Sequence, residues 1–143
     1  MTKKEIMERL GDDGKTLDLS YTEIADSDLA HLQGLTSLEW LRLDNTQVTE
    51  AGLVYLRGLK NLKGICLNCT QVLDAGLAHL QGMTQLLEIY LEDTRINGSG
   101  LVYLKGLTEL RWLYLYNTNA AVDCVDKLRR DMPNCNIFTA RRC

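Results

Sequence analysis

Apolar residues return along the chain at an interval of 24 positions, and a threonine marks each copy. These threonines are Thr22, Thr46, Thr70, Thr94 and Thr118. The clearest copy, LEWLRLDNTQVTEAGLVYLRG at residues 38–58, recurs three times downstream, the last time loosely, and a looser copy precedes it. A fixed period in this range is typical of repeat architectures, in which stacked units bury one continuous core.

Each unit changes its own periodicity part of the way through. In the second unit Leu41 and Leu43 alternate with polar residues, which is typical of a strand. Leu53, Leu56 and Leu59 then follow at a spacing of three, which is typical of a helix. We therefore predict a strand, a turn, a short helix and a return loop in every unit.

Polar residues and glycines predict where these helices begin and end. Thr49 and Asn97 have side chains that cap helix N-termini, and Asp26 and Asp74 can do so one position later. A glycine follows each predicted helix, where a C′ glycine would end it. These glycines are Gly34, Gly58, Gly82 and Gly106.

The helices are near copies at every second repeat. Residues 29–35 read LAHLQGL and 77–83 read LAHLQGM, whereas 53–59 read LVYLRGL and 101–107 read LVYLKGL. This alternation indicates that blocks of two repeats were duplicated. The alternating residues, His31, Tyr55, His79 and Tyr103, are expected to face solvent, and we assign no role to the histidines.

Residues 1–14 lie outside the repeats and predict a cap for the N-terminal end of the stack. Thr2 and Glu5 have the spacing of a capping box, and Gly11 can end the helix. Ile6, Met7 and Leu10 give it one apolar stripe. A solenoid exposes its core at both ends, so a terminal cap is needed. A docking helix for a partner is the alternative.

The pattern LxxLxLxxTxVxxxGLxxLxGL over residues 16–139 resembles the leucine-rich repeat family, and is closest to its bacterial class of 24-residue repeats with threonine at the turn. The resemblance implies an α/β fold: a right-handed solenoid of about five repeats, with a parallel concave β-sheet and convex α-helices. The family usually has asparagine at the turn. Here the five threonines must satisfy buried backbone groups, and we expect a hydroxyl ladder along the stack.

The end of the chain also resembles that class. Residues 123–143 look like its terminal helix and closing half-strand, and Pro133 should stop the helix and favour an extended Met132. Asn134 falls where the column of buried leucines should end. Residues 141–143 are expected to fray. The chain is then one domain over 1–143, with a cap at 1–14, repeats at 15–122 and the terminal elements at 123–143.

Within the strands, residues that point away from the core differ from repeat to repeat, whereas framework residues do not. Side chains alternate across a strand, so the residues that flank each buried pair share the concave face. The three columns on that face are Trp40, Gly64, Glu88, Trp112; then Arg42, Cys66, Tyr90, Tyr114; then Asp44, Asn68, Glu92, Tyr116. Divergence confined to one face predicts that this face carries the function.

Aromatic residues concentrate in the same columns. Both tryptophans of the chain lie there, with three of its six tyrosines, and Trp, Tyr and Arg are enriched at binding hot spots. We expect nine residues to bind the ligand: Trp40, Arg42, Asp44, Glu88, Tyr90, Glu92, Trp112, Tyr114 and Tyr116. Gly64 should leave a dip, and the binding energy should lie toward the C-terminal half. The alternative is that the rings pack on one another and merely cover the sheet.

Composition limits the partners. The net charge of −3 disfavours nucleic acid, because phosphate binding needs clustered Lys and Arg. No apolar run approaches the ~18 residues that span a membrane. The first residues, MTKKEIMERLG, contain no apolar stretch of the signal-peptide kind. We expect a cytoplasmic monomer with no membrane partner, and secretion stays open.

The residues with reactive side chains do not form a recognisable catalytic or metal site. Cys66 and Cys69 form a single CxxC without the further ligands that zinc needs, and it begins on a strand rather than at a helix N-terminus. The five cysteines follow no disulfide framework, although one bridge among Cys124, Cys135 and Cys143 stays open. We expect no cofactor, no metal and no enzyme activity.

The leading hypothesis is a non-catalytic module that binds a protein or peptide on the concave face, as the resemblance implies. Two alternatives stay open. The aromatic rows could stack on sugar rings in a carbohydrate-binding module. The chain could also be a structural or scaffold subunit that uses its convex face or its end caps.

Overall fold

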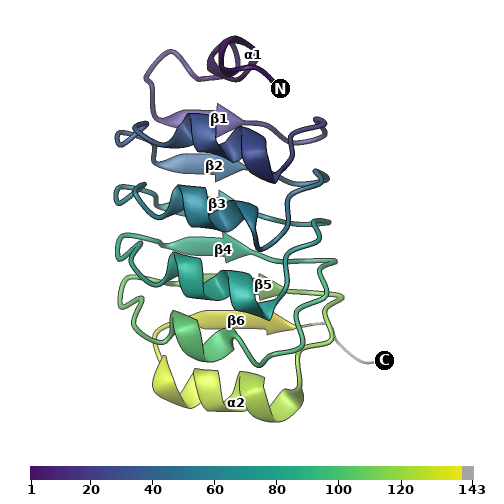
Figure 1. The fold of residues 1–143 in the computed structure, drawn as a ribbon. Coiled ribbons are helices and arrows are strands. Elements are labelled where there is room, and N and C mark those ends of the chain that lie inside the picture. Colours follow the sequence, from purple (N-terminus) through teal and green to yellow (C-terminus); the bar gives the residue numbers. More distant parts are fainter. Residues whose placement is uncertain (140–143) are drawn as a thin grey trace.

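The structure, a computed structural model, describes residues 1–139 and contains one parallel sheet of six strands. Each strand pairs with the next one in the chain, so the molecule is a ladder that runs from the N-terminal to the C-terminal end (Figure 1). The strands are β1 (Thr16–Asp18), β2 (Trp40–Arg42), β3 (Gly64–Cys66), β4 (Glu88–Tyr90), β5 (Trp112–Leu115) and β6 (Asn136–Thr139).

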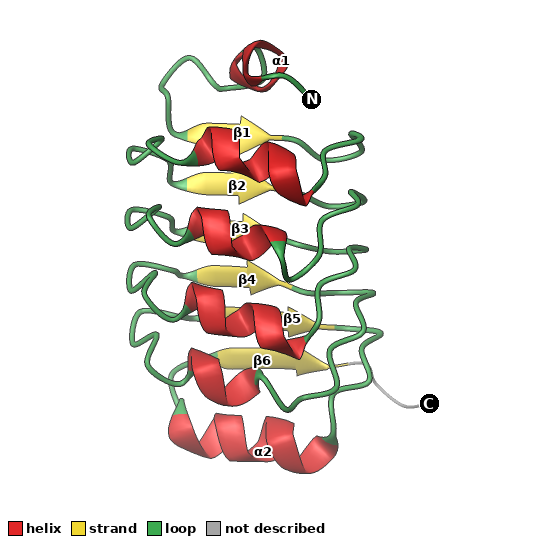
Figure 2. Cartoon of the chain, in the orientation of Figure 1, coloured by secondary structure: helices red, strands yellow, loops and turns green. Residues whose placement is uncertain are grey.

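The helices between the strands all cover one face of the sheet (Figure 2). They are η1 (Asp26–Leu32), η2 (Gly52–Leu56), η3 (Asp74–Leu80) and η4 (Leu101–Leu104), and all four are 3₁₀-helices, not the expected α-helices. The spacing of three between Leu53 and Leu56, both within η2, matches the three residues per turn of a 3₁₀-helix better than the 3.6 of an α-helix. Within residues 1–139 the α-helices are α1 (Lys3–Met7) and α2 (Val122–Asp131), one at each end of the stack.

The sheet register equals the sequence repeat. Trp40 pairs with Gly64, Gly64 with Glu88, and Glu88 with Trp112, each one repeat further along the chain. Every sequence column therefore becomes a row across the sheet. The predicted parallel sheet is confirmed.

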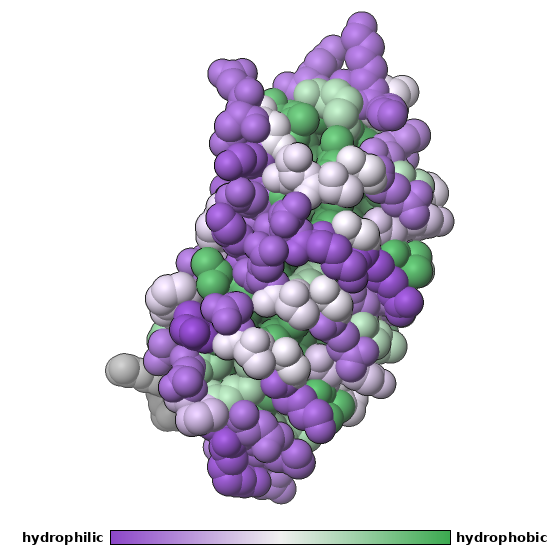
Figure 3. Space-filling view, turned by 90° about the vertical axis from the view of Figure 1, so that its left-hand side faces the viewer, coloured by the Kyte–Doolittle hydropathy of each residue, from purple (hydrophilic) through white to green (hydrophobic). Residues whose placement is uncertain are grey.

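The apolar columns form the core between the sheet and the helices. Leu43, Leu67 and Leu91 are fully buried in consecutive repeats, and the helix leucines Leu53 and Leu77 are fully buried as well. On the side of the molecule where the strands begin, polar residues cover much of the surface and apolar side chains show between them (Figure 3). No helix within residues 1–139 is long and apolar enough to cross a membrane.

The turn threonines satisfy a carbonyl in their own repeat. Thr46 Oγ1 donates to the Leu43 carbonyl at 2.6 Å, and Thr70 and Thr94 donate to the carbonyls three residues earlier at 2.7 Å. The expected row of hydroxyls is present, but each hydroxyl hydrogen-bonds within its own repeat and not to the next threonine. The carbonyl at the end of the strand would otherwise be buried without a donor.

The sequence suggested that Asp26 and Asp74 cap their own helices, but they do not. Asp26 instead accepts hydrogen bonds from the backbone N–H and the hydroxyl of Thr49 in the next repeat, at 2.7 and 2.6 Å. Asp74 accepts from the N–H groups of Asn97 at 2.7 Å, Gly98 at 3.1 Å and Gly100 at 2.7 Å. Each carboxylate therefore links one repeat to the next.

Glycine ends only one helix in the predicted manner. Gly34 has a positive φ of 98°, whereas Gly58, Gly82 and Gly106 do not have a positive φ. The left-handed backbone recurs instead just before each turn threonine, at φ values of 55–57°. These residues are Tyr21, Asn45, Cys69, Asp93 and Asn117.

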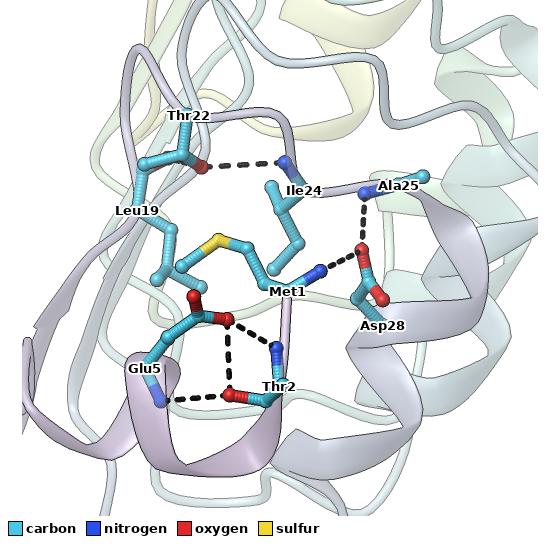
Figure 4. Close-up of polar contacts among 8 residues, drawn as sticks. All are labelled: Met1, Thr2, Glu5, Leu19, Thr22, Ile24, Ala25 and Asp28. Atoms are coloured by element: carbon cyan, nitrogen blue, oxygen red, sulfur yellow. Dashed lines mark hydrogen bonds and ion pairs between the residues drawn. The ribbon is translucent and has the colours of Figure 1, made fainter.

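The N-terminal cap forms as predicted but is shorter. Thr2 and Glu5 make the capping box, with the Thr2 backbone N–H 2.6 Å from Glu5 Oε2 and the Glu5 N–H 3.2 Å from Thr2 Oγ1 (Figure 4). Ile6 is fully buried against the first repeat, and the Met1 nitrogen lies 3.2 Å from Asp28 Oδ2. The helix ends at Met7 and not at Gly11.

The C-terminal end is closed by α2 and a complete strand. The predicted half-strand is β6, which is as long as β5 and pairs with it over four residues. Met132 and Cys135 are buried beneath it, while Asn134 is exposed, so the column of buried leucines ends where expected. The predicted fraying at residues 141–143 lies outside the described residues.

Candidate functional site

The face of the sheet opposite the helices carries three rows of outward-pointing side chains, and we call it the sheet face. The first row is Thr16, Trp40, Gly64, Glu88, Trp112 and Asn136; the second is Asp18, Arg42, Cys66, Tyr90, Tyr114 and Phe138. The third continues beyond the strands through Ser20, Asp44, Asn68, Glu92 and Tyr116, where the parallel backbone hydrogen bonds persist. All nine predicted site residues lie on this face.

Three aromatic rings of the second row stack at its C-terminal end. Tyr90 and Tyr114 are parallel within 2° with centroids 4.5 Å apart, and Tyr114 stacks on Phe138 at 4.9 Å. Tyr116 lies 6.3 Å from the same phenylalanine. Phe138 was missed from the sequence, although it stands one repeat after Tyr114 in the same column. The alternative that these rings pack on one another therefore holds for the stack.

The N-terminal half of the face differs from the prediction at Gly64. The Trp40 ring lies over this glycine so closely that a Cβ there would overlap its atoms. Trp40 is half-buried as a result. The predicted dip between Trp40 and the later aromatics is therefore wrong at Gly64 itself, because an indole ring fills the space that a side chain would take.

A hollow of about 360 Å³ nevertheless opens beside that ring. Trp40 and Glu88 line it at one end, Asp44 and Asn68 line it at the other, and the remaining lining residues are Thr16, Leu41, Arg42, Gly64, Ile65, Cys66 and Tyr90. Five of the nine predicted residues meet here: Trp40, Arg42, Asp44, Glu88 and Tyr90. Glu92, Trp112, Tyr114 and Tyr116 lie outside the hollow.

Arg42 is held between two carboxylates. Its Nη2 lies 2.7 Å from Asp44 Oδ2, and its Nη1 lies 3.5 Å from Asp18 Oδ2. The hydrogen bond to Asp44 raises the pKa of the guanidinium. Asp44 is only 5% exposed, and its Oδ1 has no hydrogen-bond partner among residues 1–139.

Tyr90 and Glu88, both on β4, line the side of the hollow that lies across from Arg42 on β2. The Tyr90 hydroxyl donates to Glu88 Oε2 at 2.6 Å, and burial together with this carboxylate raises the pKa of the phenol. In the third row the Glu92 backbone N–H donates to Asn68 Oδ1 at 2.8 Å. Burial and the neighbouring Asp93 raise the pKa of the Glu92 carboxyl.

Cys66 lies on this face, and Cys69 follows Asn68 just beyond it. Burial raises the pKa of Cys66 to about 12, and Asp44 adds to the shift. Burial and Asp93 also raise the pKa of Cys69. Within residues 1–139 the four cysteines are free, and no cluster of three or more His, Cys, Asp or Glu is placed to hold a metal. Cys143 falls outside this range. The geometry suits hydrogen bonding and apolar contact.

The histidines and tyrosines of the helix face differ in how far they are exposed. His31 is exposed, and Tyr103 is 37% exposed. His79 and Tyr55 are half-buried, and Arg57 Nε donates to His79 Nδ1 at 2.7 Å. Burial and this arginine lower the pKa of His79.

A stack of parallel strands with helices on one face, repeated with one register, is the leucine-rich-repeat fold, and the chain has this fold. Internalin C2 of Listeria monocytogenes has the same fold: it is 30% identical, with a TM-score of 0.72 over 88% of this chain and 51% of its own. An internalin of the same organism, inlF, is 19% identical, with a TM-score of 0.73 over 90% of this chain and 35% of its own.

A plant peptide hormone receptor, RGFR1, solved in complex with RGF2, is 17% identical, with a TM-score of 0.62 over 87% of this chain and 20% of its own. The chain thus spans about half the length of internalin C2 and a smaller share of the other two. No protein-family model matches the chain, and no curated protein does either.

Proposed function

We propose that the chain is a non-catalytic module that binds a protein or peptide on its sheet face. The observation that carries this proposal is the gathering of aromatic and charged side chains on one rigid surface whose rows differ from repeat to repeat. Trp112 and Tyr116 are 37% and 36% exposed and offer apolar area to a partner. The neighbouring folds, which include a receptor solved with its ligand, support a protein-binding role.

The nine residues predicted from the sequence have different roles in this proposal. Arg42, Asp44 and Glu92 orient the partner through charge and hydrogen bonds. The aromatic residues and Glu88 supply contact area and its charged rim, and Phe138 extends this surface. Burying one such ring accounts for about 2 kcal/mol at a hot spot.

The ring geometry favours protein over carbohydrate. Sugars stack on the open faces of aromatic rings, but Tyr90 and Tyr114 cover each other at 4.5 Å, and Tyr114 is also covered by Phe138 at 4.9 Å. Both faces of Tyr114 are therefore occupied. The carbohydrate alternative is left mainly with Trp40, Trp112 and Tyr116. Trp40 and Trp112 do not form one continuous platform, because Trp40 pairs with Gly64 and Trp112 with Glu88.

A quantitative pull-down with two matched double variants tests the proposal. The bait is the wild-type protein beside Trp112→Ala/Tyr114→Ala on the sheet face and His79→Ala/Tyr103→Ala on the helix face. We expect the same protein to be captured by the wild type and the helix-face variant, and to be lost with the sheet-face variant. Loss with the helix-face variant alone would favour the scaffold alternative, and binding to a glycan array would favour the carbohydrate alternative.

A further inference from the structure

Three rings in the second row of the sheet face form one continuous stack. Tyr90 and Tyr114 have ring centroids 4.5 Å apart and planes within 2° of parallel, and Phe138 follows Tyr114 at 4.9 Å. Neighbouring strands of a sheet lie about 4.8 Å apart, so the rings are stacked along the direction that leads from one strand to the next. Each ring therefore turns one face toward the preceding strand and the other toward the following strand.

The stack ends at β4, because the same row continues on β3 with Cys66. Among the described residues Tyr90 stacks on no ring other than Tyr114. Its other face is thus turned toward the short side chain of Cys66. Both residues line the hollow of about 360 Å³, so this open face of the ring borders the hollow.

The hollow has room for one further ring. Arg42 lines it on β2 and Tyr90 lines it on β4, which is two strands away. Two strand spacings amount to about 9.6 Å. A ring midway between them would lie about 4.8 Å from each side, a distance at which rings stack on one another and cations are attracted to a ring face. Along the first row the space is bounded by Trp40, whose ring lies over Gly64.

The charged groups around the hollow already have partners within the chain. Arg42 lies 2.7 Å from Asp44 and 3.5 Å from Asp18, and Glu88 accepts the Tyr90 hydroxyl at 2.6 Å. Because a guanidinium and two carboxylates line the same space, a charged group of either sign would meet a charge of its own sign. A neutral ring avoids this repulsion, and its electron-rich face complements the guanidinium of Arg42.

We propose that the hollow receives one aromatic side chain of the partner, which lies over Cys66 and stacks on the open face of Tyr90. The partner's ring continues the stack by one position, with Arg42 on its other side. This inference rests on the proposed function, because it takes the sheet face as the binding surface and adds the chemistry of the group that is recognised. It places a specificity site in the N-terminal half of that face.

Short capped peptides test the inference without knowledge of the partner. The probe is acetyl-Gly-Phe-Gly-amide, and the controls have lysine, glutamate or cyclohexylalanine in the central position. Cyclohexylalanine keeps the size of the ring but lacks its π-electrons. ¹H–¹⁵N NMR follows the Trp40 indole N–H and the backbone N–H groups of residues 66 and 68. We expect saturable shifts with the phenylalanine peptide, binding about three- to tenfold weaker with cyclohexylalanine, and no saturation with lysine or glutamate.

A variant that supplies the ring from the chain itself should block the hollow. In Cys66→Tyr the new ring takes the place proposed for the partner's ring, and the next three residues of the row are aromatic already. We expect this variant to show no saturable shifts with the phenylalanine peptide. Cys69→Tyr is the matched control, because Cys69 is exposed and lies outside the hollow. Tyr21 occupies the equivalent position two repeats earlier with φ 57°, against 55° at Cys69, so a tyrosine fits there.

Two variants of Tyr90 provide an independent test if Cys66→Tyr fails to fold. Tyr90→Phe keeps the ring and removes only the hydroxyl that Glu88 accepts. Tyr90→Leu removes the ring. We expect Tyr90→Phe to bind the phenylalanine peptide within about twofold of the wild type, and Tyr90→Leu to bind it at least about threefold more weakly.

The outcomes separate this inference from the proposed function. Equal binding of the phenylalanine and cyclohexylalanine peptides, unchanged binding to Cys66→Tyr or Tyr90→Leu, or no saturation with the phenylalanine peptide would overturn the inference. Partner binding that still depends on Trp112 would then leave the proposed function standing. Saturable binding of the phenylalanine peptide, beside a partner that ignores the sheet-face variants, would have the opposite meaning.

Discussion

On the sheet face, the neighbours of a residue change the pKa of its side chain. Cys66 shows this, because its thiol lies on the sheet face yet is held protonated. Burial raises its pKa from 9.0 to about 12, with Asp44 as a further cause. The folded state therefore binds the thiol proton more tightly than the unfolded state. The stability that this provides is complete below pH 9 and is lost as the pH rises toward 12.

Cys66 should consequently alkylate slowly in the folded protein. At pH 8 a thiol with this pKa holds roughly a thousandfold less thiolate than one with the ordinary value. We expect iodoacetamide to label Cys66 at least about a hundredfold more slowly in the folded protein than in urea, as measured by mass spectrometry of the peptide. Equal rates in the two conditions would show that the thiol is not protected.

The sequence predicted which residues share the sheet face, but not how they contact one another. Side-chain alternation and a repeat of constant length decide the rows, so all nine residues fall where expected. The Trp40 ring over Gly64 and the free oxygen of Asp44 depend on rotamers, which no periodicity encodes. Phe138 could have been found, because it continues the column of Tyr90 and Tyr114.

At the scale of elements, helices two repeats apart are alike in sequence, and they also make similar contacts. Asp26 and Asp74 occupy equivalent positions two repeats apart, and each binds the backbone of the following repeat. Glu50, at the same position between them, makes no side-chain hydrogen bond within residues 1–139. A carboxylate at this position therefore links the first repeat to the second and the third to the fourth, but not the second to the third.

Asp74 should contribute much more to stability than Glu50. It is 8% exposed and accepts three backbone N–H bonds, of which those of Gly98 and Gly100 are buried. We expect Asp74→Ala to cost about 2–3 kcal/mol of unfolding free energy, since it leaves buried donors unpaired. Glu50→Ala should stay within about 0.5 kcal/mol.

Urea melts of the two variants measure this difference. Hydrogen exchange at the Asn97, Gly98 and Gly100 amides localises it, because those amides lose their acceptor in Asp74→Ala. Equal melts for the two variants would mean that the repeats are not coupled in pairs through this carboxylate.

The sequence identified which polar side chains bind backbone N–H groups near the helix starts, but not always which N–H groups they bind. Thr49, Asp26 and Asp74 do hydrogen-bond backbone N–H groups, yet Asp26 and Asp74 do so across the repeat boundary. Glycine after each helix was expected to adopt a positive φ, and only Gly34 does. Such contacts between units depend on how the repeats stack, which the pattern of one repeat does not contain.

At the scale of the whole molecule, stability comes from stacking, because each repeat buries its leucines only against its neighbours. Leu91 lies in the middle of the buried ladder and is fully buried, whereas Leu73 is 41% exposed. We expect Leu91→Ala to cost about 2–5 kcal/mol in a urea melt, because the repeats on either side cannot close the void. Leu73→Ala is the matched control and should cost no more than about 0.5 kcal/mol. A loss below about 1 kcal/mol at Leu91 would contradict the assigned core.

The overall architecture was the most predictable part of the molecule. A strict period marked by five threonines leaves little freedom for anything but a stack with one register. The helix type was less predictable, because a run of only four to seven residues does not separate a period of 3.0 from one of 3.6. The predicted helices are present, and their backbone hydrogen bonds join residues three apart, where an α-helix would join residues four apart.

The most direct test of the central claim is the dissociation constant of the captured partner, measured by calorimetry with single variants on the two faces. Trp112→Ala should weaken binding at least tenfold, which is about 1.4 kcal/mol, with the melting curve nearly unchanged. Tyr114→Ala should also weaken binding at least tenfold, but it should lower the stability as well, because Tyr114 stacks between Tyr90 and Phe138. His79→Ala and Tyr103→Ala should leave the affinity as it is. If the helix-face variants abolish binding while the sheet-face variants bind normally, the functional face is the opposite one.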